Sequence, residues 1–439
     1  MGGHFPRGMA CATLQIVVGI ASMNPSARIH WLSAVLLAAV TATAAETPPS
    51  LKEAFAGHFP VGAAINRSHA TGIGGRRSAG QITQEVALVK RHFNQITAEN
   101  DMKWQLIHPR EGADGYDFAP ADAFVAFGVS NRMEIVGHTL VWHSQTPNWV
   151  FAGTNPAPAV TNAAPVAAGE TNAPGTNRIG RRGPPFGAGP FGRYTGPRAS
   201  REEMLERMRD HIHTVVGRYR GKVRVWDVVN EAIADGNGTN VLRNSLWLEI
   251  IGPDYIARAF QFAHEADPQA ILRYNDYGLE NPVKRQKLLA LIQSLQEQKV
   301  PIHAIGSQAH VNVGTTFETM DQSLSEMKAL GLPIHITELD VNSAQGGQQG
   351  TGADIAANAA TTQGVLVSDA DRKLADAYAG IFRAFHKHRD CVKLVTFWGV
   401  NDAVSWRANG KPLLFDGNNQ PKPAFDAVIA EATRAETAR

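Results

Sequence analysis

The sequence has few cysteines and almost no net charge. Its 439 residues include two cysteines, Cys11 and Cys391, too few for a disulfide framework or a thiolate metal site. The 42 basic and 40 acidic residues leave a formal net charge of +2, so bulk charge argues neither for nor against nucleic-acid binding. No G-x-G-x-x-G turn follows the first apolar run of the body, Val61 to Asn66, which disfavours a doubly wound dinucleotide-binding sheet. No pattern in the chain suggests a nucleotide, flavin or nucleic-acid site.

The N-terminal region has no apolar run that would span a bilayer comfortably. Trp31 to Val40 is apolar but short. Arg28 and His30 precede it, and small residues from Thr41 to Ala45 follow it. This order is typical of a signal peptide. We therefore expect a leader at residues 1–45 and an exported protein, periplasmic or extracellular, with no stable membrane anchor.

Strand-like and helix-like patterns alternate through the rest of the chain. Helix starts are visible where Ser200 and Glu203 stand at capping-box spacing and where Asn281 precedes Pro282. Eight strand–helix units in one order predict an α/β fold, a (β/α)8 TIM barrel, as a single catalytic domain at residues 46–439. The strand-like runs are Val61 to Asn66, Gln95 to Asn100, Glu134 to His143, Val223 to Glu231, Ile271 to Tyr277, Ala304 to Val311, Pro333 to Val341 and Lys393 to Asn401.

Two segments do not fit the barrel pattern. Residues 151–199 are rich in Pro, Gly, Asn, Thr and Ala, and residues 342–367 are rich in Gly, Gln and Ala. Both lack a period and are expected to be low-complexity loop insertions on the catalytic face. The first carries Phe186, Phe191 and Tyr194, so a flap that contacts substrate is the alternative to a tolerated insertion.

Two of the buried runs lead into glutamates. Val223 to Glu231 ends in Asn230-Glu231, and Pro333 to Val341 contains Glu338 and Asp340. A carboxylate at the end of a buried strand is costly unless it is solvated, paired or used. In a barrel the C-terminal strand ends converge on one face. We therefore expect Glu231 and Glu338 to face one cleft.

Paired carboxylates indicate one chemistry above others. Two carboxyl groups on either side of a sugar bond are the minimal requirement for glycoside hydrolysis, one protonated and one ionised. Trp142, Trp398 and Trp406 suit a carbohydrate because flat indole faces pack against pyranose rings. Core packing is the alternative reading of each tryptophan.

The chain resembles the family 10 glycoside hydrolases, the endo-1,4-β-xylanases, from about Val61 to Phe425, with the two insertions as departures. The order and spacing of five motifs carry the resemblance. These motifs are Thr97-Ala98-Glu99-Asn100-Asp101-Met102-Lys103-Trp104, Gly137-His138-Thr139-Leu140-Val141-Trp142-His143-Ser144-Gln145, Trp226-Asp227-Val228-Val229-Asn230-Glu231, Gly306-Ser307-Gln308-Ala309-His310 and Ile336-Thr337-Glu338-Leu339-Asp340.

The resemblance implies a retaining, monomeric endo-1,4-β-xylanase that acts on xylan and xylo-oligosaccharides without a cofactor. Glu231 would be the acid/base and Glu338 the nucleophile, with carboxyl groups about 5 to 5.5 Å apart. Asn230 would hold the sugar 2-hydroxyl, and His310 and Asp340 would support Glu338. The expected substrate-binding residues are Glu99, Asn100, Lys103, His138, Trp142, Gln145, Asn275, Tyr277, Gln308, Trp398 and Trp406, with Asn275 and Tyr277 towards the leaving group and Trp406 as a lid.

Two other classes of protein stay open from the residues alone. A polysaccharide-binding protein would keep the fold without the chemistry, although the intact carboxylate set argues against it. A metal-dependent barrel hydrolase would use the pairs His211/His213 and His386/His388. Both pairs lie in helical patterns, where residues two apart do not face one another, so we expect no metal and no effect of EDTA.

Overall fold

The computed structural model describes residues 49–74, 77–153, 194–345, 365–366 and 368–434. The chain divides into two units, Met1–Pro49 and Ser50–Arg439, and the second contains every helix and strand that the structure describes. The expected leader at residues 1–45 lies outside the described residues, as do Phe186 and Phe191 of the first insertion. Within those residues, no helix is long and apolar enough to cross a bilayer.

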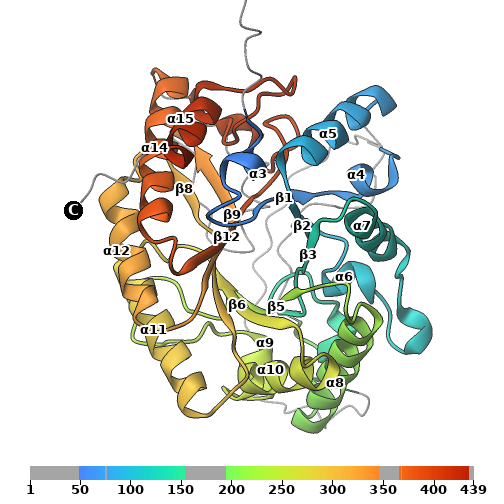
Figure 1. The fold of residues 1–439 in the computed structure, drawn as a ribbon. Helices are drawn as coiled ribbons and strands as arrows, with labels where there is room; N and C mark the ends of the chain where they lie inside the picture. The colour runs from blue at the N-terminus through green and yellow to red at the C-terminus, as the bar shows by residue number, and fades with distance from the viewer. Residues whose placement is uncertain (1–48, 75–76, 154–193, 346–364, 367, 435–439) are drawn as a thin grey trace, which may run out of the picture. The chain divides into compact units, whose positions relative to one another are not determined.

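Eight parallel strands close into a barrel, as the alternation of patterns predicted (Figure 1). Neighbouring strands pair in the order of the chain, and the last strand pairs with both the first and the seventh. Because all eight run in the same direction, their C-terminal ends meet at one face. The strands are β1 Val61–Ile65, β2 Gln95–Ala98, β3 Glu134–Gly137, β5 Val225–Asn230, β6 Ile271–Asp276, β7 Ala304–Ser307, β9 Ile334–Asn342 and β12 Val392–Phe397.

Two of the predicted strands are interrupted near their C-terminal ends. The third run divides into β3 and β4, Val141–Trp142, because Leu140 N donates to Asp227 O at 3.0 Å and shifts the chain onto β5. The sixth run divides into β7 and β8, His310–Asn312, around Ala309, whose φ is +54°. The short strand β8 pairs with β9. Each interruption moves the strand tip against the neighbour that carries a glutamate.

Helices surround the barrel and follow the capping signals of the sequence. Ser200 Oγ accepts from Glu203 N at 3.1 Å, and Asn281 Oδ1 accepts from Val283 N at 2.8 Å, so both predicted starts are confirmed. The helices are α3 Leu51–Ala54, α4 Arg67–Thr71, α5 Ala79–His92, α6 Trp104–Ile107, α7 Ala119–Ser130, α8 Arg201–Arg218, α9 Leu246–Ile250, α10 Tyr255–Ala266, α11 Pro282–Glu297, α12 Phe317–Lys328, α14 Ala370–Lys387 and α15 Pro423–Ala432.

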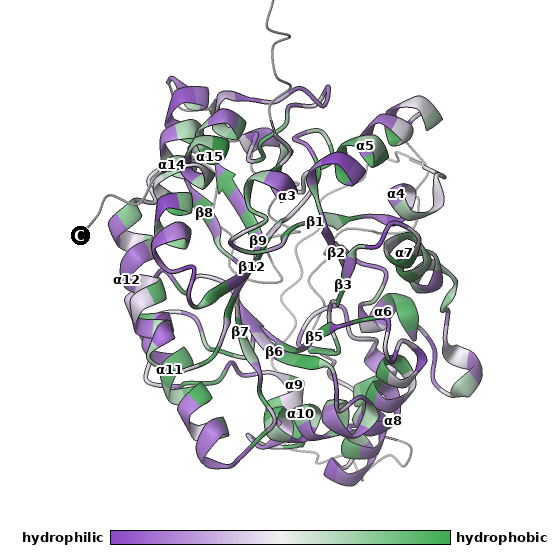
Figure 2. Ribbon diagram, in the orientation of Figure 1, coloured by the Kyte–Doolittle hydropathy of each residue, from purple (hydrophilic) through white to green (hydrophobic). Residues whose placement is uncertain are grey.

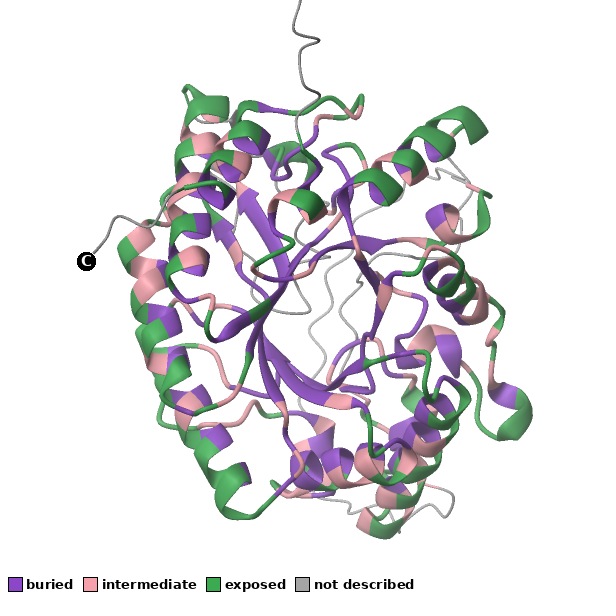
Figure 3. Ribbon diagram, in the orientation of Figure 1, coloured by how far each residue is buried: buried purple, intermediate pink, exposed green. Residues whose placement is uncertain are grey.

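The core lies between the strands and the inner faces of these helices. The long helices are hydrophilic and exposed on their outer sides, whereas the strands are buried along most of their length (Figures 2 and 3). The first helix of this unit, α3, contacts α15, the last one. Helix α14 packs along α15 and contacts β9, so the C-terminal helices support the strand that carries Glu338.

The two insertions leave the barrel through short paired segments. Ala152 pairs with Arg198 in an antiparallel bridge. At the second insertion β10, Ala344–Gln345, pairs with β11, Val365–Leu366. The structure therefore adds a two-stranded base to a segment that the sequence predicted as loop throughout, because Asn342 Oδ1 accepts from Ala344 N at 2.9 Å and turns the chain out of β9.

Candidate active site

Two buried glutamates are joined through three amide side chains. Glu231, directly after β5, is 4% exposed, and Glu338, in β9, is 5% exposed. Asn275 Nδ2 donates to Glu338 Oε1 at 2.8 Å and to Asn230 Oδ1 at 2.9 Å. Gln308 Nε2 donates to Glu231 Oε1 at 3.0 Å and lies 3.4 Å from Asn230 Oδ1. The structure thus brings both glutamates to one site, as their strand positions predicted.

Hydrogen bonds also fix the orientation of the amides. Thr337 Oγ1 donates to Asn275 Oδ1 at 2.7 Å, so Nδ2 of Asn275 must face Asn230 and Glu338. Asn230 Oδ1 receives donors from two amides, and among the described residues its Nδ2 has no protein acceptor. Asn275 was expected towards the leaving group. The structure buries it completely, in hydrogen-bond contact with Asn230 and Glu338, and the expected position towards the leaving group stays a prediction.

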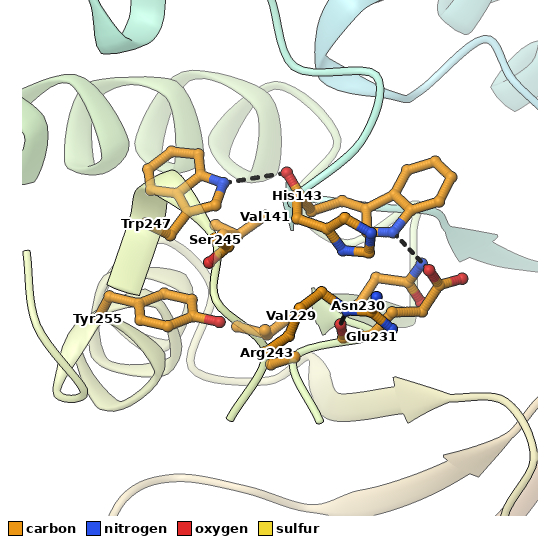
Figure 4. A pocket seen from close by; sticks show the side chains of 11 residues that line it. Val141, His143, Val229, Asn230, Glu231, Arg243, Ser245, Trp247 and Tyr255 are labelled. Carbon is orange, nitrogen blue, oxygen red and sulfur yellow. Dashed lines mark hydrogen bonds between the residues drawn. The ribbon is translucent and has the colours of Figure 1, made fainter. Parts of the chain in front are cut away.

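Glu231 lies in surroundings that favour its protonated form. Burial and the negative charges of Asp276 and Glu338 raise the pKa of Glu231, against the lowering effect of the hydrogen bonds from Gln308 and Trp142. Trp142 Nε1 donates to Glu231 Oε2 at 2.8 Å (Figure 4). The backbone of Glu231 is left-handed, with φ +57°, and its N–H donates to Asn275 O at 2.8 Å. A single left-handed residue of this kind costs about 1 to 2 kcal/mol, and it turns the carboxyl group across the end of the barrel.

Glu338 lies in surroundings that favour its ionised form. His310 contacts Glu338 Oε2 through Nε2 at 3.1 Å and Asp340 Oδ2 through Nδ1 at 3.0 Å. Burial would lower the pKa of His310, but Asp340 and Glu338 outweigh it and raise that pKa to about 9. Burial would raise the pKa of Glu338, but His310 and His138 outweigh it and lower that pKa. One glutamate is therefore suited to donate a proton and the other to attack as a carboxylate.

A charged cluster fills the barrel beneath the site. Asp227 accepts from Arg273 Nε at 2.7 Å and lies 3.0 Å from His138 Nδ1. Burial opposes ionisation of Asp227, but Arg273 and His138 prevail and lower its pKa to about 2. Arg273 Nη1 lies 3.1 Å from His335 Nδ1, and burial lowers the pKa of His335 to about 3. Neither Asp227 nor Arg273 was among the predicted site residues, although an arginine inside an apolar run is a visible signal.

Two tryptophans lie against the imidazole rings of the site. Trp398 meets His138 edge to face at 5.3 Å between ring centroids and His310 at 6.3 Å. Trp406 Nε1 donates to Asp340 Oδ2 at 2.8 Å, and its ring lies 5.0 Å from His310. Two of the three tryptophans expected at the sugar site, Trp398 and Trp406, thus lie on its Glu338 side.

Lys103, one of the expected substrate-binding residues, lies beside Trp142. Lys103 Nζ donates to Asn100 Oδ1 at 2.9 Å and lies 5.1 Å from the centre of the Trp142 ring. Burial lowers the pKa of Lys103 and raises that of Glu99. Gln145 O accepts from Gln105 N at 2.8 Å, which ties that segment to the chain after Lys103.

Tyr277 and its partners lie on the other side of Glu231. The Tyr277 hydroxyl donates to Asp235 Oδ2 at 2.5 Å and accepts from Arg243 Nη2 at 2.6 Å. Arg243 Nε donates to the carbonyl oxygen of Glu231 at 3.1 Å. Arg243 also lines the pocket beside Glu231 that Figure 4 shows. Asp235 and Arg243 were not foreseen because the segment after β5 has no periodic pattern.

The histidine pairs considered as metal ligands do not converge. His211 is buried and stacks on Trp104 at 3.7 Å between centroids, whereas His213 faces Glu265 at 3.1 Å. His386 lies 4.8 Å from the ring of His58.

His388 Nε2 lies 2.7 Å from Asp321 Oδ1. Among the described residues, one group of metal-type ligands falls within 4.8 Å, namely His388, Asp390 and Cys391. Asp390 is already paired with Lys328.

A family model matches most of the chain. The model described as glycosyl hydrolase family 10 covers residues 50–165 and 192–431. The chain is 38% identical over 392 residues to an endo-1,4-beta-xylanase of Geobacillus stearothermophilus, which spans 87% of this chain and 98% of that one. It is 36% identical over 391 residues to a beta-1,4-xylanase of Dictyoglomus thermophilum, which spans 87% and 90%.

Solved structures agree with this assignment. A GH10 endoxylanase from a sugarcane soil metagenome superposes with a TM-score of 0.69 at 33% identity, over 88% of this chain and 99% of that one. An intracellular xylanase from Thermoanaerobacterium saccharolyticum, solved as a mutant with xylotriose, gives 0.68 at 33% identity over 87% and 99%.

Proposed function

The chain belongs to glycosyl hydrolase family 10, and we propose that it is a retaining endo-1,4-β-xylanase that cleaves internal bonds of xylan. One observation carries the proposal. Two buried glutamates with oppositely shifted pKa values, Glu231 raised and Glu338 lowered, are held at one site by the same chain of amides. Such a pair supplies the acid and the nucleophile of a double displacement.

In the first step, an oxygen of Glu338 forms a bond to the anomeric carbon while the glycosidic C–O bond breaks. The proton of Glu231 passes to the leaving oxygen, so the shorter sugar chain departs as an alcohol. His310 keeps Glu338 ionised before the attack because it offers a cationic donor at 3.1 Å. Loss of negative charge from Glu338 on bond formation weakens this pair, which favours Glu338 as the leaving group of the second step.

In the second step, Glu231 is a carboxylate and accepts a proton from water. The water oxygen attacks the same anomeric carbon, and the Glu338–carbon bond breaks. Two inversions at one carbon give net retention. The hydrogen bonds from Trp142 and Gln308 occupy both oxygens of Glu231 and hold the carboxylate for this second role.

Relatives and contacts support xylan as the substrate. The two relatives described above are named xylanases, and related structures contain xylotriose and xylotetraose. Asn230 Nδ2, which has no acceptor among the described side chains and backbone, suits a sugar 2-hydroxyl. Gln145 and Trp406 would crowd a hydroxymethyl group and so favour xylose over glucose.

The experiment is release of reducing ends from plain xylan, with carboxymethylcellulose as the comparison and NMR of the first product anomer. We expect β-configured products, and α-configured products would refute retention. Glu338→Ala should abolish cleavage of all substrates. Glu231→Ala should spare aryl glycosides with good leaving groups, because these need no proton. Equal loss on both substrate types would contradict the role of Glu231.

We also propose export. The basic, apolar and small residues of positions 28–45 support it, and N-terminal sequencing of protein recovered from periplasm and medium tests it. An intact N-terminus retained in the cytoplasm would contradict it.

A further inference from the structure

Asp340 is a fully buried carboxylate that connects three elements of the site. It is 0% exposed and sits in β9, two residues after Glu338. Its Oδ2 contacts His310 Nδ1 at 3.0 Å and Trp406 Nε1 at 2.8 Å. Its Oδ1 contacts Arg407 Nη1 at 2.9 Å. A buried carboxylate needs such donors, because an isolated one is expensive to desolvate.

Arg407 comes from the loop that follows β12. Its side chain is 17% exposed, and its guanidinium lies 4.5 Å from the centre of the Trp406 ring. The loop is anchored below by Lys422, whose Nζ lies 2.9 Å from Asp402 Oδ2 and donates to Leu413 O at 2.8 Å. The loop that carries Arg407 is therefore held in place by Lys422, and Arg407 contacts both Asp340 and Trp406.

We propose that Arg407 is a positioning residue for the nucleophile and for the tryptophan above it. By holding Oδ1 of Asp340, it leaves Oδ2 to orient His310, which in turn orients Glu338. By stacking on Trp406, it sets the angle of that indole over the site. The inference rests on the proposed function, since it assigns Arg407 a part in supporting Glu338 as nucleophile.

The four charged side chains that connect Glu338 to Arg407 alternate in sign. Glu338, His310, Asp340 and Arg407 follow one another as negative, positive, negative and positive groups at contact distance. Burial raises the pKa of Asp340, but Arg407 and His310 outweigh it and lower that pKa.

Other titratable groups face these four residues from neighbouring elements. They are His138, Lys103, Asp227 and Glu231 towards Glu338, Glu280 towards His310, and Tyr378 towards Asp340. Of these, His138, Lys103 and Glu280 do not contact Asp340 in the described structure. Besides His310, the cation in contact with the Asp340 carboxylate there is therefore Arg407.

Removal of the charge has a defined sign. Arg407→Met takes a positive charge from the end of the chain, so the pKa values of Asp340, His310 and Glu338 should all rise. An opposite charge in direct contact moves a carboxyl pKa by about 1 to 3 units, and one acting through two intermediate groups by less. We expect the acid limb of kcat/KM to rise by about 0.5 to 1 pH unit, a three- to tenfold loss on the acid side.

The experiment compares Arg407→Met with Arg407→Lys and with Arg218→Met, a control that removes an exposed ion pair with Asp122. The pH profile of kcat/KM on xylan and the NMR titration of the His310 imidazole are measured for each folded protein. For Arg407→Met we expect the acid limb to move to higher pH, the alkaline limb to stay unchanged, and the His310 imidazole to titrate at higher pH. Arg407→Lys should partly restore the wild-type acid limb and imidazole titration.

A merely structural role of Arg407 would lower the melting temperature without moving the acid limb or the imidazole titration. Either quantity unmoved in folded Arg407→Met overturns the inference. Wild-type protein that is inert on xylan would overturn the proposed function instead, and the imidazole titration would still decide the role of Arg407.

Discussion

Trp142→Phe should move the alkaline limb of the pH–activity profile upwards. The indole N–H donates to Glu231 Oε2 at 2.8 Å. This bond stabilises the carboxylate more than the carboxylic acid, so it lowers the pKa of a group that burial raises. Phenylalanine keeps an aromatic ring and removes the donor. The pKa of Glu231 should therefore rise, and the acid should stay protonated to higher pH.

The size of the shift follows from the energy of the lost bond. A hydrogen bond to a charged group contributes about 1.5 to 3 kcal/mol and one between neutral groups about 0.5 to 1.5 kcal/mol. The difference of about 1 to 1.5 kcal/mol corresponds to roughly one pKa unit. The assay is kcat/KM on xylan against pH. The plateau of kcat/KM should also fall, since a phenyl ring covers less of a sugar and makes a weaker cation–π interaction with Lys103.

Trp398→Phe is the matched control. Its ring lies beside His138 and His310 and makes no hydrogen bond to Glu231 in the described structure. It should lower the plateau and leave the alkaline limb in place. An alkaline limb that stays put or falls in Trp142→Phe would refute the assignment of that limb to Glu231.

Three further predictions concern the surroundings of the site. Thr337→Val removes the donor to Asn275 Oδ1 and leaves a buried carbonyl unpaired at a cost of about 1 to 3 kcal/mol. We expect kcat/KM to fall about tenfold in Thr337→Val and to stay near the wild-type value in Thr337→Ser. Equal loss of kcat/KM in both variants would contradict this role of the hydroxyl. Arg273→Met removes the cation in contact with Asp227 and leaves that buried carboxylate with His138 alone, so it should lower the free energy of unfolding by about 3 to 5 kcal/mol at pH 7 in denaturant titrations. The pKa of Asp227 in the folded protein is about 2, below its unfolded value, so the pair stabilises above about pH 4; the deficit should shrink as pH falls towards 2, and a deficit that grows on acidification would overturn the pairing. Activity on xylan should be unchanged by EDTA. Loss of activity in EDTA, followed by its recovery on addition of a divalent ion, would support a metal-dependent reaction instead.

Much of the fold followed from local signals. The caps at Ser200 and Asn281 announced their helices because side-chain oxygens there satisfy free backbone N–H groups. The strand runs were visible because parallel strands buried on both sides are continuously apolar. Their interruptions were not visible. The break before Val141 depends on a hydrogen bond from Leu140 to Asp227, 87 residues further along the chain by their numbers.

The sequence predicted which residues form the site better than it predicted the hydrogen bonds between them. Glu231 and Glu338 stood out because a carboxyl group after an apolar run demands an explanation. The bridge from Asn275 to Glu338 was not predicted, since only coordinates show which side chains meet across the barrel. Arg243 and Arg407 were overlooked because each lies in an irregular segment, where neither period nor spacing predicts a partner.

The contact between α3 and α15 has a practical consequence. The first and last helices of the barrel unit are neighbours, so a short linker between residues 50 and 434 could replace the natural ends. New ends could then be opened in an exposed helix–strand connection far from the carboxylates. Such a rearranged chain would keep the closed ring of strands, because pairing of β1 with β12 is lateral and independent of where the polypeptide starts.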